Sequence, residues 1–562
     1  MTVIKGRGTA SCYPWRVSAL GNETVSSPSE RSTDQAKLVA SLCDPSLYGT
    51  SCKRVTVLET HISYVLLTGS FAYKIKKAVD LQFLDFTTLS ARRFYCEQEL
   101  RLNRRLAPAL YLDVIAITGS VEAPVLGGRG RALEYAVKMR EFPQDALASR
   151  LLERDELSGA DVDALAAKVA SFHASVDVAP AERAFAAPED ILQSALQNFA
   201  QIQPLLDNAA EHSDLTALRV WTEREHATCR ASLLGRQHDG HIRECHGDLH
   251  LGNIARIDGE LTIFDCIEFN DALRWIDVMS EVAFTVMDLH DRGRPDLGHR
   301  FLNAYVEITG DYAGLSVLRF YLVYRAMVRA KIARVRAAQV EPGKGRAASL
   351  SECAGYVKLA MDYTRAMRPA IVITHGLSGC GKTTLSQAFV ELTGAIRVRT
   401  DVERKRLLGL GPRERSRTSL GKELYAEEPT RATYRHACAL ARSIVAAGRI
   451  ALIDAAFLKR WQRDLFRALA SELAVPFVIV DFEASEPTLR ERIARRLRAD
   501  NDASDADLAV LDHQLRTHEP LAVDESSLAV SFDAEAPPEV ARSTEPWRRV
   551  LQRLEVEPML IS

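Results

Sequence analysis

The chain has 562 residues, too long for one hydrophobic core, and its 47% hydrophobic content is that of a globular protein with three or four structural units. Its 72 Lys and Arg nearly cancel its 74 Asp and Glu, which excludes an overall field favouring nucleic acid or a membrane, so anions must bind at local sites. Ten cysteines without a C-x-x-C pair, and no signal-like or membrane-length apolar run, predict a cytoplasmic protein without a zinc ribbon or disulfide framework.

Residues 1–30 lack helical and strand periodicity, so we expect a flexible tail. Two β-rich runs between 55 and 80, separated by a Thr-Gly-Ser turn, indicate a small antiparallel sheet. Apolar residues then recur at helical spacing over 88–107, and "ALEYAVKMREF" returns to a strand. This order of strands, one helix and strands predicts a small α+β lobe.

Helical patterns dominate from 145 to about 338, interrupted by "HGDLHLGN" (246–253) and the apolar run "LTIFDCIEF". Residues 31–340 are therefore expected to form a two-lobed α+β domain. "EPGKGRAAS" breaks the helical periodicity and predicts a linker that, with a connecting helix, occupies 341–368. From 369 to 562 strands alternate with helices, which predicts an α/β domain with a parallel sheet.

The segment "HGDLHLGN" carries the first group of candidate catalytic residues. Asp248 and Asn253 stand five positions apart, and Asp265 follows seventeen residues after Asp248. Protein kinases place a catalytic Asp, a metal-binding Asn and a second metal-binding Asp in this order. Phosphoryl transfer requires a carboxylate that orients the attacking hydroxyl, and an amide oxygen with a second carboxylate that hold magnesium against the ATP phosphates.

The wording H-G-D-x-H-x-x-N resembles the aminoglycoside phosphotransferase family of kinase-like enzymes. The resemblance implies a protein-kinase-like fold over roughly residues 35–340, with Asp248 as the base and Asn253 and Asp265 as magnesium ligands. It also implies that His246 and His250 brace the loop, with help from Asp277 in "RWIDV". An alternative is a hydrolase metal site made by His246, Asp248 and His250, which alternate as ligands on a strand do.

A kinase also needs a strand lysine on the ATP phosphates, paired with a helical glutamate. "FAYKIKK" offers Lys74 and Lys76 on one strand face, and we prefer Lys74 because "AYK" is similar to the family's strand. Glu97 and Glu99 compete as its partner, and we prefer Glu99. The lysine strand lacks a preceding G-x-G-x-x-G, a departure from protein kinases that favours a small-molecule kinase.

"GLSGCGKT" matches G-x-x-x-x-G-K-[ST] between an apolar strand and a helix, which is strong evidence for a P-loop. Backbone N–H groups of such a loop converge on phosphate oxygens, the lysine reaches the outer phosphates and the threonine binds magnesium. The predicted nucleotide-binding residues are Gly376, Ser378, Gly379, Cys380, Gly381, Lys382, Thr383 and Thr384, with Thr383 also a magnesium ligand.

Acidic residues at two predicted strand ends are candidates for handling the acceptor hydroxyl and the magnesium ion beside the P-loop. Asp401 lies where ligands of α/β proteins bind and is our candidate for orienting a hydroxyl, although it could instead be the N-cap of "VERKRLL". Asp454 ends the next strand and is expected to bind magnesium or water. Arg496, or its neighbour Arg495, could close over the phosphoryl group, unless this arginine cluster is a solvated helix face.

Another basic helix, "YRAMVRAKIARVRAA", places Arg325 and Arg329 one turn apart. A phosphate- or acid-binding face is one interpretation. We expect instead a solvated helix lying against the large lobe.

Residues 369 to about 530 resemble AAA-type P-loop kinases such as gluconate kinase, chloramphenicol phosphotransferase and polynucleotide kinase domains. The order of the two domains resembles the bifunctional aminoglycoside phosphotransferase/ATP-binding proteins. This resemblance implies use of ATP and Mg²⁺ by both halves, with hydroxyls of sugars, aminocyclitols or sugar acids as small-molecule acceptors. Two other interpretations remain: the P-loop half could be a nucleotide-sensing regulatory module, or the family label could point to antibiotic resistance.

Overall fold

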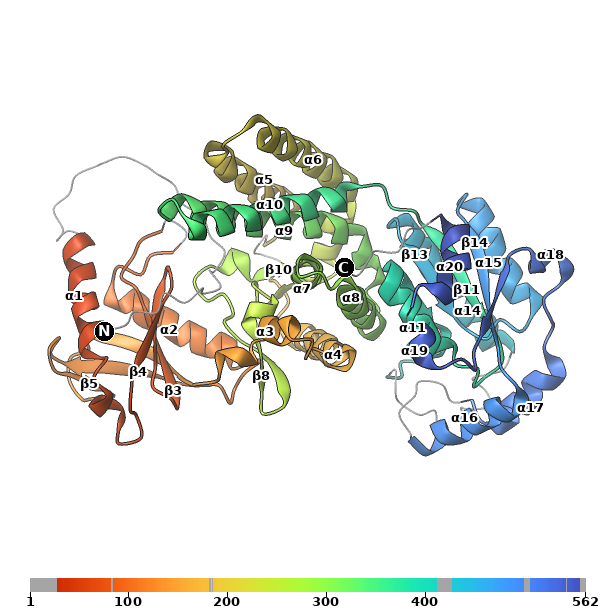
Figure 1. Cartoon of the computed structure of the whole chain (residues 1–562), viewed down its shortest axis with the longest axis horizontal. Helices are drawn as coiled ribbons and strands as arrows, with labels where there is room; N and C mark the ends of the chain where they lie inside the picture. Colours follow the sequence, from red (N-terminus) through yellow and green to blue (C-terminus); the bar gives the residue numbers. More distant parts are fainter. Residues whose placement is uncertain are drawn as a thin grey trace. The chain divides into compact units, whose positions relative to one another are not determined.

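The computed structural model describes residues 28–81, 84–180, 183, 185–411, 427–499, 506–541 and 543–555. The chain forms two compact units (Figure 1). The first comprises residues 1–161, 171–291 and 319–364, and the second comprises 162–170, 292–318 and 365–562. Most of the predicted tail lies outside the described residues, and its last three residues begin helix α1 (Pro28–Ser41).

The first unit contains a small lobe built on a six-stranded antiparallel sheet in the order β1-β2-β3-β6-β4-β5. Thr88 caps the single helix α2 (Leu89–Asn103) by accepting a hydrogen bond from the N–H of Ala91, and α2 packs on β4 and β6. The predicted order of strands, helix and strands is therefore confirmed. The strands are β1 (Thr56–Glu59), β2 (Ser63–Leu67), β3 (Phe71–Lys76), β4 (Tyr111–Gly119), β5 (Pro124–Leu126) and β6 (Glu134–Arg140).

A mainly helical lobe follows, and it carries the loop 246–253 between two short pairs of strands. Strand β7 (Ile242–Glu244) pairs with β10 (Trp275–Asp277), and β8 (Ile254–Ile257) forms a hairpin with β9 (Glu260–Ile263). Helix α7 (Val278–Asp291) is buried from Val278 to Leu289, so it can support the loop rigidly. The other helices are α3 (Ala148–Glu153), α4 (Gly159–Ser175), α5 (Pro188–Ile202), α6 (Ala209–His238), α9 (Leu315–Gln339) and α10 (Lys344–Thr364).

Helix α10 begins at Lys344, within the segment that was expected to be a linker, and it packs on α6 and α7. Helices α4 and α9 contribute residues to both units. Among the described residues, no helix combines the length and the apolar character that crossing a membrane would require.

The prediction that the basic helix is solvated is wrong, because four of the five cations of α9 that follow Tyr324 are buried, and only the last, Arg336, is partly exposed. Arg325 stacks on Phe284 and donates to the carbonyl of Ser280. Its neighbours find partners in α5, α10 and the segment after α5: Arg329 donates to Tyr356, Lys331 to Asn198, and Arg334 to Leu205 and Asp207. Long cationic side chains can be buried when carbonyl and carboxylate partners satisfy their donors.

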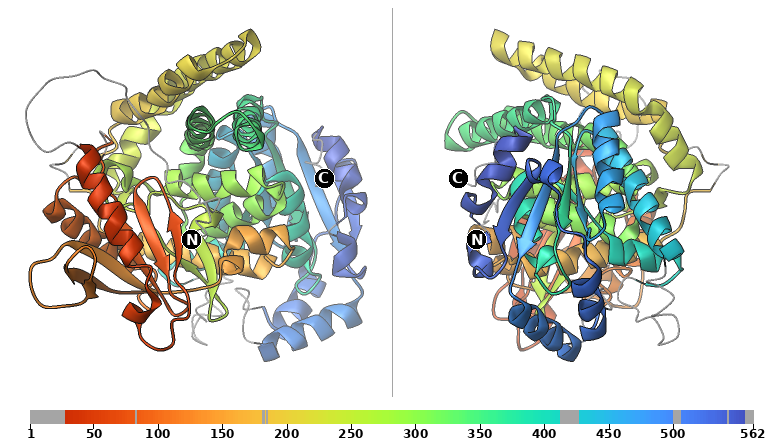
Figure 2. Two further views of the ribbon diagram at one scale, coloured as in Figure 1. Left: turned by 60° about the vertical axis from the view of Figure 1, so that its left-hand side comes forward. Right: turned by 90° about the vertical axis from the view of Figure 1, so that its right-hand side faces the viewer.

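The second unit is an α/β domain whose five strands are all parallel, in the order β12-β13-β11-β14-β15. Helix α14 (Glu427–Ala446) packs on β12 and β13 and α15 (Arg460–Glu472) packs on β11, and Figure 2 (right) shows helices on both faces of the sheet. The predicted parallel sheet is thus confirmed. The strands are β11 (Ala370–His375), β12 (Ile396–Arg399), β13 (Ile450–Asp454), β14 (Phe477–Glu483) and β15 (Ala529–Asp533).

The central strand β11, buried along its whole length, leads directly into the P-loop. Helix α8 (Pro295–Thr309) belongs to this unit and packs on α11 and β12. The remaining helices are α11 (Lys382–Thr393), α12 (Thr400–Leu407), α14 (Glu427–Ala446), α15 (Arg460–Glu472), α16 (Glu486–Ala499), α17 (Leu508–Thr517), α18 (Val523–Ser526), α19 (Pro538–Ala541) and α20 (Arg548–Leu554).

Candidate functional site

The loop between β7 and β8 brings Asp248 and Asn253 into contact. The Asn253 Nδ2 donates to the Asp248 Oδ2 at 3.1 Å and to the Asp248 carbonyl at 2.9 Å. Both residues are buried. Burial alone would raise the pKa of Asp248, but the nearby charges of His250, Arg329 and His246 hold that pKa well below its usual value. The carboxylate is therefore ionised at neutral pH and can accept a hydrogen bond from a hydroxyl.

The ring nitrogens of the two loop histidines contact the loop itself and the segment just before Asp265. His246 bonds through Nε2 to the Phe264 carbonyl at 2.8 Å, and its Nδ1 accepts from the Asp248 N–H. His250 accepts the Gly252 N–H at Nδ1, and its Nε2 lies 3.4 Å from the Asp248 Oδ2. With every ring nitrogen engaged, the alternative of a hydrolase metal site is disfavoured.

Helix α7 holds the loop backbone through three side chains that the sequence analysis missed. The Gly247 N–H donates to Glu281 at 2.6 Å, the Thr285 hydroxyl donates to the Leu249 carbonyl at 3.0 Å, and the Leu251 N–H donates to Asp288 at 2.8 Å. Positions 281, 285 and 288 share one helix face, so polar residues at i, i+4 and i+7 in an apolar helix were the available signal. Asp277, expected to help hold the loop, instead pairs with Arg236 at 2.8 Å and accepts the N–H of Met279.

The two candidate lysines of β3 both contact Glu99. Lys74 Nζ lies 2.8 Å from Glu99 and 2.5 Å from Asp265, whereas Lys76 Nζ lies 2.8 Å from Glu99 and also pairs with Glu268. Glu97, the competing partner, is on the exposed face of α2 and pairs with Arg93 (side chains 49% and 57% exposed). The geometry thus favours Glu99, and of the two lysines it is Lys74 that reaches Asp265.

Of these groups, Glu99 and Lys74 stay ionised at neutral pH. Burial would raise the pKa of Glu99, but Lys74 and Lys76 lower it to about 2. Burial would lower the pKa of Lys74, but Asp265 and Glu99 raise it well above its usual value. Asp265 itself adopts a left-handed backbone conformation (φ 65°), which is uncommon for a residue other than glycine and often marks a functional position.

Asn253 and Asp265 could hold magnesium, because they offer the oxygen ligands that this ion prefers. They lie close together, since the Phe264 N–H donates to the Asn253 carbonyl at 2.9 Å and Asp265 is the next residue. Because the Asn253 amide nitrogen is used on Asp248, its amide oxygen is the atom left for a metal.

His173, Cys245 and Glu281 form a second buried cluster with ligand atoms within 4.8 Å of one another. His173 Nε2 is hydrogen-bonded directly to Glu281 at 2.8 Å. Burial raises the pKa of the Cys245 thiol well above its usual value, so the thiol stays protonated. These contacts fit a support for the catalytic loop better than a metal site.

In the second unit, the P-loop joins β11 to α11 and depends on its glycines. Gly376 and Gly379 have φ values of 141° and 87°, and a Cβ atom would lie 2.7 Å from the Phe482 carbonyl and 2.9 Å from the Leu489 carbonyl. Lys382 spans the loop and donates to the carbonyls of Gly376 and Leu377 at 2.9 Å each.

The predicted magnesium ligands of this unit meet, because the Thr383 hydroxyl donates to Asp454 at 2.6 Å. Asp401 lies in the first turn of α12, and Arg404 NH1 lies 3.0 Å from its carboxylate. The N-cap position belongs to Arg399, so the alternative interpretation of Asp401 as the N-cap is wrong.

These residues line one cavity of about 600 Å³. It brings together Lys382, Thr383, Asp401, Asp454 and Arg496, five of the residues proposed from the sequence, and Ser378, Gly379, Gly381, Thr384 and Arg495 line it too. The other two predicted nucleotide-binding residues of the loop, Gly376 and Cys380, are buried and lie outside the lining. The sequence analysis missed three arginines of the lining, Arg399, Arg404 and Arg492, and five of its polar residues: Thr400, Thr430, Tyr434, Gln462 and Gln514.

Helix α16 contributes the arginines at the phosphate end of this cavity. Arg492 donates to the Cys380 carbonyl at 3.3 Å and to the Ala534 carbonyl at 2.8 Å, so it touches the P-loop directly. Arg496, one turn later, donates to the Ala506 carbonyl. The spacing of four residues between them was the signal available in the sequence. Most of the Ser/Asp/Asn-rich loop expected after α16 falls outside the described residues.

Comparisons with known proteins match each half separately. The family described as "Phosphotransferase enzyme family" matches residues 93–321, and the family described as "AAA domain" matches residues 371–521. Relatives from Mycobacterium tuberculosis and Mycobacterium bovis, each described as an uncharacterized protein, are 30% identical over 453 residues, which is 80% of this chain and 88% of theirs.

Two solved structures are similar to parts of the chain. A choline/ethanolamine kinase family protein from Mesorhizobium loti is 14% identical with a TM-score of 0.35, covering 59% of this chain and 99% of that one. A sugar kinase from Janibacter sp. is 21% identical with a TM-score of 0.25, covering 34% of this chain and 96% of that one.

Proposed function

The chain belongs to a family that joins a phosphotransferase domain to an AAA-type P-loop domain, and we propose that both halves are ATP- and magnesium-dependent kinases acting on hydroxyls of small molecules. One observation supports the proposal: each half brings together a lysine, two oxygen-bearing side chains of the kind that bind magnesium, and a further carboxylate.

In the kinase-like half, Lys74 would contact the ATP phosphates, with Glu99 holding its ammonium group in place. Asp248 would orient the acceptor hydroxyl and take its proton while the new O–P bond forms and the bond between the γ-phosphorus and ADP breaks. Asn253 and Asp265 would hold magnesium, which neutralises phosphate charge when bound.

In the P-loop half, the N–H groups of residues 376–384 and Lys382 would bind the phosphates, and Thr383 and Asp454 would hold magnesium. Asp401 would orient the acceptor hydroxyl and accept its proton. The cavity has six cationic side chains and two acidic ones: Lys382, Arg399, Arg404, Arg492, Arg495 and Arg496 against Asp401 and Asp454. Within the proposed acceptor classes, this excess of positive charge suits sugar acids better than neutral sugars or cationic aminocyclitols.

The test uses the full chain, labelled ATP and a metabolite extract. Asp248→Asn should remove the products of the kinase-like half while ATP binding persists, and Asp401→Asn should remove those of the P-loop half. Loss of a general base lowers turnover by about 10²- to 10⁴-fold. If Asp248→Asn leaves every product in place, the first assignment fails. If Asp401→Asn changes no product but alters the rate of the other half, the regulatory interpretation of the P-loop domain is correct.

A further inference from the structure

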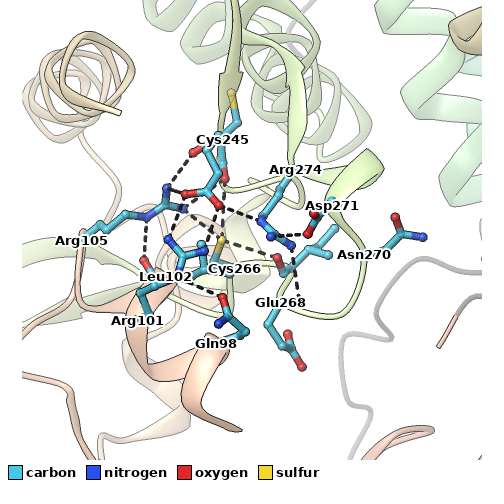
Figure 3. A network of polar contacts seen from close by, with 12 residues as sticks. Gln98, Arg101, Leu102, Arg105, Cys245, Cys266, Glu268, Asn270, Asp271 and Arg274 are labelled. Carbon is cyan, nitrogen blue, oxygen red and sulfur yellow. Dashed lines mark hydrogen bonds and ion pairs between the residues drawn. The ribbon is translucent and has the colours of Figure 1, made fainter. Parts of the chain in front are cut away.

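A single buried carboxylate, that of Glu244 in β7, accepts hydrogen bonds from three arginines. Arg101 NH2 and Arg105 NH1 lie 2.9 Å from its oxygens, and Arg274 Nε lies 3.1 Å away. Figure 3 shows these arginine side chains converging beside Cys245. We call Glu244, Arg101, Arg105 and Arg274 the Glu244 clamp. It lies outside the residues assigned above to catalysis or nucleotide binding.

The clamp joins three segments that are far apart in sequence. Arg101 is in the last turn of α2 and Arg105 follows its end, whereas Glu244 stands two residues before the catalytic loop. Arg105 also donates to the carbonyls of Glu244 and Cys245 at 2.8 and 3.3 Å and lies 3.5 Å from the Cys266 sulfur. Cys245 directly precedes the loop 246–253, and Cys266 directly follows Asp265. The segment at the end of α2 therefore contacts residues adjacent to that loop and to Asp265.

Arg274 connects Glu244 to the segment that follows Asp265. In the sequence it stands between Asp265 and β10; its side chain pairs with Asp271 and lies 3.4 Å from the Glu268 carbonyl. The segment that carries Asp265 is therefore tied to β7 through the same carboxylate that holds α2.

The same helix carries Glu99, whose carboxylate contacts Lys74. Asn103, one turn after Glu99, donates to the Glu99 carbonyl and accepts the Cys266 N–H, both at 2.9 Å. The placement of Glu99 relative to Asp265 thus depends on how α2 is docked, and the clamp is the charged part of that docking.

Charge explains why Glu244 matters more than any one arginine. Among the described residues, the carboxylates in ion pairs with the three arginines are those of Glu244, which is 4% exposed, and Asp271, which is half exposed. Removing the carboxylate would leave guanidinium groups facing one another without their shared acceptor. Burial would raise the pKa of Glu244, but Arg101, Arg105 and Arg274 lower it below its usual value, so the clamp is charged at neutral pH.

We propose that Glu244 is a positioning residue of the kinase-like site, which docks α2, and with it Glu99 and Lys74, onto the backbone of the catalytic loop. This inference rests on the function proposed above for that half.

The experiment measures Mg·ATP binding by calorimetry in the full chain, with Lys382→Ala present throughout so that the P-loop half does not contribute. Glu244→Gln should weaken binding on the order of tenfold, within the range that substitutions in coupling networks produce. Arg101→Gln should weaken it less, and combining it with Glu244→Gln should recover part of the loss because one uncompensated charge is removed. The matched control is Arg93→Gln, since Arg93 is also on α2 but pairs with an exposed glutamate.

Hydrogen exchange along α2 separates positioning from mere stability. Glu244→Gln should speed exchange of residues 89–103 well below the melting temperature, with β8 and β9 unchanged. Unaltered exchange in α2, or Mg·ATP affinity equal to that of the parent despite a lower melting temperature, would overturn the proposal. If Glu244→Gln does not fold, Arg101→Gln carries the same two measurements. If the Lys382→Ala parent binds no Mg·ATP, the function proposed for the kinase-like half fails, and the exchange measurement still decides on the clamp.

Discussion

Glu281 offers the sharpest test of how the catalytic loop is held. Its carboxylate is fully buried, accepts the Gly247 N–H at 2.6 Å through one oxygen, and bonds to His173 at 2.8 Å through the other. Burial would raise the pKa of Glu281, but His173, His246 and the Gly247 N–H lower it below its usual value. The residue is thus a charged acceptor of two hydrogen bonds, each worth about 1.5–3 kcal/mol.

Glu281→Ala removes both bonds and strands the Gly247 N–H and His173 in an apolar site. Losing two hydrogen bonds to a charged acceptor costs about 3–6 kcal/mol. For a unit of more than 250 residues this corresponds to a fall of about 6–12 °C in melting temperature, at about 2 °C per kcal/mol. Glu281→Gln retains an acceptor for Gly247 and should lose only about 1–2 kcal/mol.

Differential scanning calorimetry of the full chain measures the shift, and the transition of the P-loop half serves as an internal reference. Glu223→Ala is the matched control: Glu223 pairs with Arg219 on the exposed surface of α6, and such pairs contribute about 0–1 kcal/mol. If Glu281→Ala melts within 2 °C of the parent protein, in the manner expected for Glu223→Ala, the loop does not depend on α7 as argued here.

Three further outcomes are expected. Gly247→Ala should destabilise the first unit more than Gly259→Ala does, as measured by urea unfolding. Both glycines have φ near 90°, but only at position 247 would an added Cβ atom lie 2.6 Å from a carbonyl oxygen. Equal effects of the two substitutions would contradict this. Thr383→Val should weaken nucleotide binding about tenfold with Mg²⁺ present and little in EDTA, and an equal loss in both would show that the hydroxyl does not serve the metal. Folding lowers the pKa of Glu99 from 4.5 to about 2, so the free energy of unfolding that ionised Glu99 contributes should be present above pH 4.5 and decline as the pH drops toward 2. Between pH 5 and 3 the free energy of unfolding of Glu99→Gln should therefore fall less than that of the parent protein.

The architecture could be predicted from the sequence because hydrophobic periodicity and turn residues mark the strands and helices of each half locally. Strand and helix patterns are legible within windows of ten to twenty residues, and the P-loop follows its strand directly. The choice between Lys74 and Lys76 could not be made from periodicity, since both point to the same side of β3 and, in the structure, both contact Glu99. Only the position of Asp265, 191 residues after Lys74, distinguishes them.

The error on α9 has a physical cause that pattern analysis cannot detect. Four cations recurring along an amphipathic helix ordinarily face water. Here Arg325 and Arg334 reach carbonyl oxygens of other segments, and Lys331 reaches an amide, so partners remote in sequence decide their burial. Arg325 also lies 3.4 Å from the Gly247 carbonyl, which makes it part of the support for the catalytic loop.

The two sites differ in how their backbones are held, and this difference decides how much of each a sequence reveals. The P-loop is shaped mainly by its own glycines and by Lys382, which donates to carbonyls five and six residues earlier, while Arg492 and Gln514 add contacts from outside the motif. The catalytic loop of the kinase-like half is held by side chains of α7 and α9, 34 to 78 residues away. Substitutions that damage the kinase-like site should therefore be scattered along the chain. Those that damage the P-loop site should cluster in the motif and the strand ends beside it.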